Sequence, residues 1–309
     1  MAVRVRGSKI AVLKTYLIGA TLITALGASA CGGRTPLDGA STNANTTAAP
    51  KPHVDAGVVM PSQWPSCQTM PIVMLVNRHT PQSPRYAFAK SLPDSGAITI
   101  GPSLTCHDLG AIEWGAMAVV SKARAYVLFS SDTSPLSGTQ YLGLFDLESG
   151  ACESTVKLSS APSLATLALV PHDGVTTLYT YKRDPRLFGE VAPDSGTFTS
   201  LREIKVDDAP GSMSGSFDGS IWVRSGARVR KFEPSAGAEL EAFALTDSGP
   251  TALAVGVWGD DLIATGGNNA RGWSLYRRNA SSFREVAVLP DESAHMSAVG
   301  AGPCSQTTR

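Results

Sequence analysis

The chain carries little charge and no excess of either sign. Of its 309 residues 17% are charged, and 26 lysines and arginines balance 26 aspartates and glutamates. Proteins that bind nucleic acid usually present a basic surface that neutralises phosphates, so this balance argues against a nucleic-acid partner. Amphipathic helices are also missing after the N-terminus, because the apolar residues alternate with period two or form short runs. Together with 30 glycines and 20 prolines, this pattern predicts an all-β protein.

Sequence signatures of catalysis and of metal binding are scarce. The chain contains no G-x-S-x-G, P-loop, H-E-x-x-H, EF-hand or C-x-x-C motif. The five histidines are scattered: His53, His79, His107, His172 and His295. We expect such isolated histidines to be solvated, and we expect neither a metal nor a cofactor.

The remaining polar clusters are expected to be surface features. They are the paired acids Asp207-Asp208 and Asp260-Asp261, the Gly-rich residues 266–269, and the cationic set Arg224, Arg228, Arg230 and Lys231. Residues 266–269 read as a turn without the strand–helix context that phosphate binding requires. The cationic set is expected to lie on an exposed face.

The N-terminus has the pattern of a secretory signal peptide. Residues 1–14 are basic, and residues 16–28 form an apolar run that is too short to span a bilayer comfortably. The run ends in Ala28-Ser29-Ala30-Cys31. Small residues directly before a cysteine resemble the lipobox of bacterial lipoproteins, which implies that residues 1–30 are removed and that Cys31 is lipidated. The alternative is cleavage after the A-x-A-like Ala28-Ser29-Ala30, which would release a soluble secreted protein.

The same resemblance implies a location. The residue after Cys31 is Gly32 and not the aspartate that retains lipoproteins at the inner membrane, so we expect the outer membrane, on its periplasmic side or at the cell surface. The membrane partner is then the lipid on Cys31. Residues 31–65 are rich in small and polar residues, and they cannot bury enough apolar surface to fold. We predict a flexible tether there, followed by a folded domain over residues 66–305.

A repeated marker runs through residues 66–305: a short strand that leads into a turn. The markers are YAFAKSLPDSG, YLGLFDLESG, LFGEVAPDSG, VRKFEPSAG and WSLYRRNASS, which begin at residues 86, 141, 187, 229 and 273. The terminal glycines of the first four can supply the positive φ that such turns need. These glycines are spaced by about 41 to 54 residues, close to the period of propeller blades.

Each marker belongs to a unit of four strands, except that the first unit lacks its innermost strand. Residues 295–301 (HMSAVGA) match the innermost strand within residues 251–259 (TALAVGVWG), and they can fill that place. The result is a β-propeller of five four-stranded blades, closed by the C-terminal strand and free of open sheet edges. The turn SFDGSIWV at residues 216–223 resembles NHL-type and quinoprotein-like repeats, which implies the same fold. Six or seven blades, or two stacked β-sandwiches, are the alternatives.

Four cysteines remain besides Cys31, namely Cys67, Cys106, Cys152 and Cys304. An even number in an exported chain indicates disulfides, and four cysteines allow three pairings. In a closed propeller Cys67 precedes the first strand and Cys304 follows the last, so ring closure brings them together. We therefore predict Cys67–Cys304 and Cys106–Cys152; a metal site is the alternative.

Two function classes fit this architecture. The first is a non-catalytic binding or scaffolding module that holds a protein, peptide or glycan on a propeller face. The second is an enzyme, such as a metal-assisted hydrolase, lactonase or lyase, with His295 or another His/Asp set at the mouth of the central channel. The expected innermost strands carry almost no acidic, basic or His residues, so the sequence favours binding over catalysis.

Overall fold

The computed structural model describes residues 65–80, 83–92, 95–106, 115–130, 139–159, 164–172, 175–183, 186–202, 210–245, 251–268, 272–279, 282–290 and 294–304. The predicted signal peptide, the predicted tether up to residue 64 and the lipidation site Cys31 lie outside these residues. The described part contains no helix that is both long enough and apolar enough to cross a bilayer.

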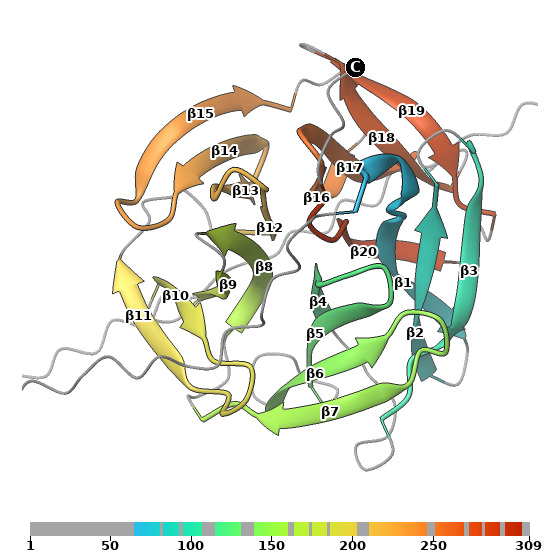
Figure 1. The fold of residues 1–309 in the computed structure, drawn as a ribbon. Coiled ribbons are helices and arrows are strands. Elements are labelled where there is room, and N and C mark those ends of the chain that lie inside the picture. Colours follow the sequence, from blue (N-terminus) through green and yellow to red (C-terminus); the bar gives the residue numbers. More distant parts are fainter. Residues whose placement is uncertain are drawn as a thin grey trace, which may run out of the picture. The chain divides into compact units, whose positions relative to one another are not determined.

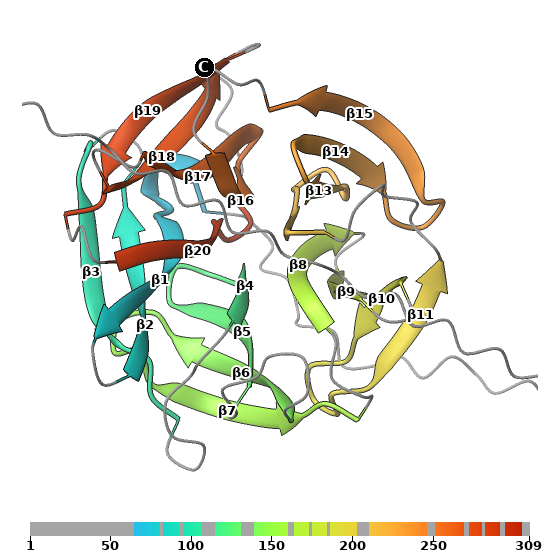
Figure 2. The same ribbon diagram turned by 180° about the vertical axis from the view of Figure 1, so that it is seen from behind.

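Five antiparallel four-stranded sheets form the domain (Figures 1 and 2). Blade 1 contains, from the inside outward, β20 (Ala294–Gly300), β1 (Ile72–Thr80), β2 (Ser83–Ser91) and β3 (Ile98–Ser103). Blade 2 contains β4 (Gly115–Val119), β5 (Arg124–Ser130), β6 (Gln140–Asp146) and β7 (Cys152–Lys157). Blade 3 contains β8 (Leu164–His172), β9 (Val175–Lys182), β10 (Leu187–Val191) and β11 (Phe198–Arg202).

The last two blades follow the same order. Blade 4 contains β12 (Ser212–Gly215), β13 (Ile221–Ser225), β14 (Arg228–Glu233) and β15 (Ala238–Ala244). Blade 5 contains β16 (Thr251–Trp258), β17 (Asp261–Asn268), β18 (Gly272–Asn279) and β19 (Ser282–Val288). The prediction of a five-bladed propeller is therefore confirmed. One short 3₁₀ turn, η1 (Cys67–Thr69), precedes β1.

The C-terminal strand β20 closes the ring, as expected. It pairs antiparallel with β1, where Val73 faces Gly300 and Asn77 faces His295. The innermost strands β20, β4, β8, β12 and β16 pack against one another in that order, and β16 packs against β20. No innermost strand is therefore left without a neighbouring blade on either side.

Each gap between adjacent blades holds one hydrophobic cluster. The cluster between blades 5 and 1 includes Met74, Trp258 and Met296, and the other four gaps are filled in the same way. Because both faces of every sheet are covered, the inner strands are apolar on both faces, as in β4 and β5, where nearly every residue is buried. The outermost strands β7 and β15 are mostly exposed.

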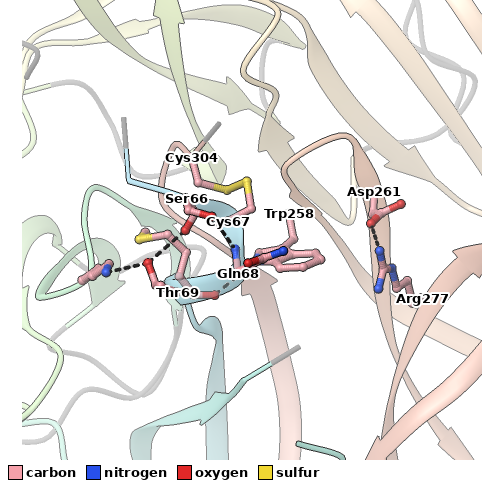
Figure 3. The surroundings of a disulfide bond; sticks show 10 residues. Ser66, Cys67, Gln68, Thr69, Trp258, Asp261, Arg277 and Cys304 are labelled. Atoms are coloured by element: carbon pink, nitrogen blue, oxygen red, sulfur yellow. Dashed lines mark hydrogen bonds and ion pairs between the residues drawn. A yellow bond between two sulfur atoms is a disulfide. The ribbon is translucent and has the colours of Figure 1, made fainter. Parts of the chain in front are cut away.

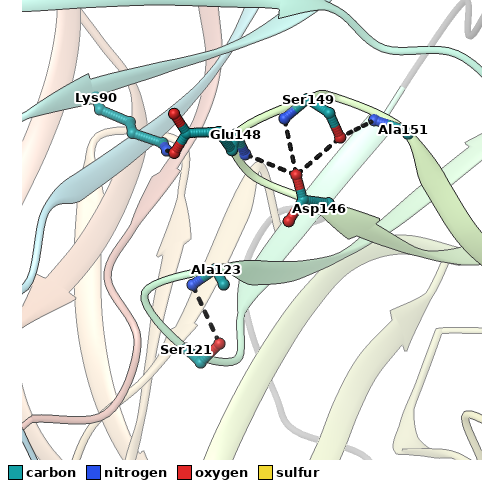
Figure 4. A network of polar contacts seen from close by, with 7 residues as sticks. All are labelled: Lys90, Ser121, Ala123, Asp146, Glu148, Ser149 and Ala151. Carbon is teal, nitrogen blue, oxygen red and sulfur yellow. Dashed lines mark hydrogen bonds and ion pairs between the residues drawn. The ribbon is translucent and has the colours of Figure 1, made fainter.

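The turns that end the markers share one chemistry. Gly96, Gly150, Gly196 and Gly237 adopt φ values of 64°, 69°, 66° and 66°, which L side chains rarely adopt. In the first three turns the preceding serine accepts a hydrogen bond from the backbone N–H two residues on, as Ser149 does from Ala151. In blade 2 the carboxylate of Asp146 also accepts from the backbone N–H groups of Glu148 and Ser149 (Figure 4). The expected positive-φ glycines are thus confirmed.

Both predicted disulfides are present. Cys67 and Cys304 are bonded with their Cα atoms 4.9 Å apart, although 237 residues separate them in sequence. Cys106 and Cys152 form the second bond, between the segment after β3 and the outermost strand of blade 2. Figure 3 shows the first bond beside η1, with Trp258 of blade 5 nearby. The indole N–H of Trp258 donates to the carbonyl of Met70 at 3.1 Å.

Candidate functional site

The central channel is lined by small and aliphatic side chains with a few hydroxyls. One hollow lies toward the beginnings of β4, β8 and β12, and its lining includes Ala116, Thr166, Ser212 and Ser297. A second hollow lies at the ends of the innermost strands, and its lining includes Pro171, Phe217 and Pro303. Each has a volume of about 20 Å³, which is room for about one water molecule.

Serine hydroxyls in this lining hold neighbouring blades together. Ser212 and Ser214 of β12 accept hydrogen bonds from the backbone N–H groups of Val255 and Val257 in β16, at 3.0 and 3.1 Å. Ser297 of β20 donates to the carbonyl of Leu75 at 3.0 Å. These hydroxyls therefore serve the contacts between and within blades.

The histidines considered for chemistry do not form a cluster among the described residues. His295 is exposed at the start of β20, and its Nδ1 accepts a hydrogen bond from the indole N–H of Trp273 at 2.9 Å. His53 and His107 lie outside the described residues, and only the backbone is described for His79 and His172. Within the described part, no three His, Cys, Asp or Glu side chains are placed to hold a metal ion.

Two expectations about polar clusters are corrected. Residues 266–268 belong to strand β17 and are not a turn. In the cationic set, Arg230 is only 9% exposed and lies 3.7 Å from the carboxylate of Glu239. Arg224 is half-buried, and burial lowers the pKa of its guanidinium. Neighbouring blades cover strands β13 and β14. Arg230 is therefore buried and Arg224 is half-buried, which differs from the expected exposed cationic face.

A hollow with a polar lining lies on blade 5 and was missed by the sequence reasoning. It has a volume of about 250 Å³ and is lined by Asp261, Arg277, Arg278 and Arg284. Asp261 follows the turn between β16 and β17, so the pocket lies at the same end of the blade as the ends of the innermost strands. We call it the arginine pocket.

The strand register brings two of these arginines, Arg277 and Arg284, together on one face of the sheet. Arg277 of β18 and Arg284 of β19 are directly opposite each other in the ladder. Arg277 forms an ion pair with Asp261, and its guanidinium lies 5.1 Å from the ring centroid of Trp258 (Figure 3). Arg278 lies 3.0 Å from the carboxylate of Glu241 and 4.0 Å from the ring centroid of Phe243, both in blade 4. In the sequence this cluster is visible only as the pair Arg277-Arg278 before one hairpin turn and Arg284 after it.

No protein-family model matches the chain, and no curated protein matches it at a significant level. The fold is similar to a chain in a crystal structure of a nidogen/laminin complex, with 14% identity and a TM-score of 0.44 over 71% of this chain and 78% of that one. A Bacteroides caccae protein of unknown function has 13% identity and a TM-score of 0.36 over 71% and 73% of the two chains. Myxococcus xanthus glutaminyl cyclase has 12% identity and a TM-score of 0.38 over 60% and 69%. These likenesses are distant, so the propeller assignment rests on the sheet topology.

Proposed function

We propose that this chain is an exported, lipid-anchored β-propeller that acts as a binding or scaffolding module for a protein, peptide or glycan. The observation that carries the proposal is the central channel. The two hollows described above each have room for about one water, and their lining is largely aliphatic and hydroxylic. In this proposal the ring is a rigid support, and the partner binds to one of its faces.

One face of the propeller has an exposed aromatic residue at the channel mouth. Phe217, in the turn between β12 and β13, is 39% exposed and lies beside Pro171 and Pro303. Aromatic side chains are enriched among the residues that contribute most to protein interfaces. We propose this face, formed by the ends of the innermost strands, as the recognition face.

Photo-crosslinking in intact cells tests the recognition face. A photoreactive phenylalanine analogue at Phe217 is compared with the same analogue at Leu240, which is 56% exposed on the outer strand β15. We expect a discrete crosslinked species at Phe217 and none at Leu240. Equal labelling at both positions would refute the assignment of the face. Turnover of ester, lactone or glycoside substrates by the purified full chain, lost when Phe217 is replaced, would refute a non-catalytic module.

The proposed anchor is Cys31, with attachment to the outer membrane. Acyl chains contribute about 0.8 kcal/mol per buried methylene, so the lipid can hold the chain at the membrane without a protein–lipid contact. Metabolic labelling with a palmitate analogue should label the full chain and leave Cys31→Ser unlabelled and soluble. A membrane-free, unlabelled wild-type chain would support cleavage after Ala30 instead.

A further inference from the structure

The arginine pocket carries an inference that does not depend on the binding-module proposal. Its four described lining residues are three arginines and one aspartate, and they surround a hollow of about 250 Å³. We propose that the arginine pocket binds the phosphate group of a phosphate monoester or free phosphate.

The guanidinium group of Arg277 is preorganised for binding. Arg277 is fixed by its ion pair with Asp261 and by the ring of Trp258, whose own indole N–H is bonded to Met70. Arg278 follows Arg277 directly, so its side chain leaves the other face of the sheet, toward Glu241 and Phe243 of blade 4, and is not counted among the binding groups. Guanidinium groups that are already held in place lose less conformational entropy when a ligand binds.

Arg284 carries a positive charge beside another arginine. Arg284 is exposed, and no carboxylate of the described residues lies within ion-pair distance of it. Its direct cross-strand neighbour is Arg277, and like charges in that position destabilise a sheet. An anion between the two guanidinium groups would turn this repulsion into attraction.

Two facing guanidinium groups favour a phosphate over a carboxylate as the bound anion. A guanidinium donates two parallel hydrogen bonds to an oxyanion, and a carboxylate has only two oxygens to accept them. A phosphate group offers three acceptor oxygens and close to two negative charges at pH 7, so it can bind Arg277 and Arg284 at once. A pocket of about 250 Å³ also leaves room for a small attached group.

Calorimetric titration of the full chain in detergent tests the proposal. The probes are glucose 6-phosphate, inorganic phosphate and glucuronate, and the variants are Arg284→Gln and Arg228→Gln. Arg228 begins β14 in blade 4, is exposed and lies outside the pocket lining, so its replacement removes the same charge elsewhere. We expect phosphate binding that weakens with added salt, that is at least about tenfold weaker in Arg284→Gln, and that is unchanged in Arg228→Gln.

Thermal unfolding separates lost binding from lost folding. Without ligand, Arg284→Gln should melt at the wild-type temperature or above it, because the repulsion from Arg277 is removed. If glucose 6-phosphate binds more tightly than inorganic phosphate, the ligand of the pocket is a phosphate monoester. If the two bind with equal affinity, the ligand is free phosphate. The proposal is overturned if neither binds in the millimolar range, if glucuronate binds more tightly than both, or if the two variants lose the same affinity.

Discussion

At the scale of single residues, Gly256 of β16 sets how closely two blades can approach. A Cβ atom at this position would overlap the backbone of Val299 in β20, and one at Gly215 would overlap the carbonyl of Leu169 in β8. Neither glycine has a positive φ, so the requirement comes from the close approach of the innermost strands and not from backbone conformation.

Gly256→Ala should therefore destabilise the propeller by about 1–3 kcal/mol, the usual range for overpacking a core. Gly300→Ala is the matched control, because Gly300 lies in the adjacent strand β20 and has no atom within 4 Å of an added Cβ. Denaturant unfolding of the two variants gives the comparison. Equal stability of both would contradict the close approach.

Asp218 supports the turn between β12 and β13. Burial by itself raises the pKa of its carboxyl, but hydrogen bonds from Lys231 and Ser220 outweigh burial and lower the pKa to about 2. Because the folded-state pKa is below that of the unfolded chain, the carboxylate stabilises the fold above about pH 4. This contribution is lost as the pH falls toward 2.

Asp218→Asn should reduce stability at pH 7 by less than about 1 kcal/mol, since the ion pair with Lys231 is half exposed and screened by solvent. The difference between wild type and variant should shrink as the pH is lowered from 5 to about 2. Unfolding curves across that range measure it. A difference that is constant with pH would show that the carboxylate charge is not responsible.

At the scale of secondary-structure elements, the two disulfides tie different kinds of segment: Cys106 and Cys152 flank an isolated β-bridge between Thr105 and Ala151, whereas no bridge is described between the segments of Cys67 and Cys304. Cys67–Cys304 joins η1 to the segment after β20 across 237 residues, whereas Cys106–Cys152 spans 46. In the chain-entropy account, the longer loop restricts the unfolded state more.

Replacing Cys67 and Cys304 by serine should cost about 2–5 kcal/mol of unfolding free energy, and slightly more than the same change at Cys106 and Cys152. Denaturant unfolding of the two double variants under oxidising conditions measures both losses. An unchanged midpoint for the first variant would mean that β20 pairing alone holds the ring closed.

At the scale of the whole molecule, β20 makes a ring out of a row of blades. Deleting residues 294–304 would leave blade 1 with the three strands β1, β2 and β3 and would expose the edge of β1, a template for pairing with other chains. We expect this truncation to aggregate, as measured by light scattering during refolding.

A synthetic peptide of residues 294–304 should restore the monomeric fold when it is added during refolding, because it supplies the missing strand. The same peptide with Val299→Asp places a charge in the cluster between blades 5 and 1 and should fail to do so. If both peptides restore the monomeric fold, any extended chain that pairs with the edge of β1 is sufficient.

The position of each strand followed largely from local chemistry. Glycines such as Gly150 and Gly196 stand where a turn needs positive φ, and apolar runs of strand length lie between such turns. Residues 295–301 match the innermost strand of the fifth unit, and this match predicted that the C-terminal strand closes the ring. Ring closure in turn predicted the pairing of Cys67 with Cys304.

The arginine pocket and the buried Arg230 could not be obtained in this way. Whether Arg277 faces Arg284 depends on the register of one hairpin, and a shift of one residue would move a side chain to the other face of the sheet. The ring of Trp258 under Arg277 is a contact between two strands that are not paired with each other, and the cover over β14 comes from packing between blades. Short-range turn and strand preferences thus determined the order of the strands and favoured five blades, whereas the tertiary structure decided the number of blades and which side chains meet, because those contacts depend on strand register and on the lateral fit of the blades.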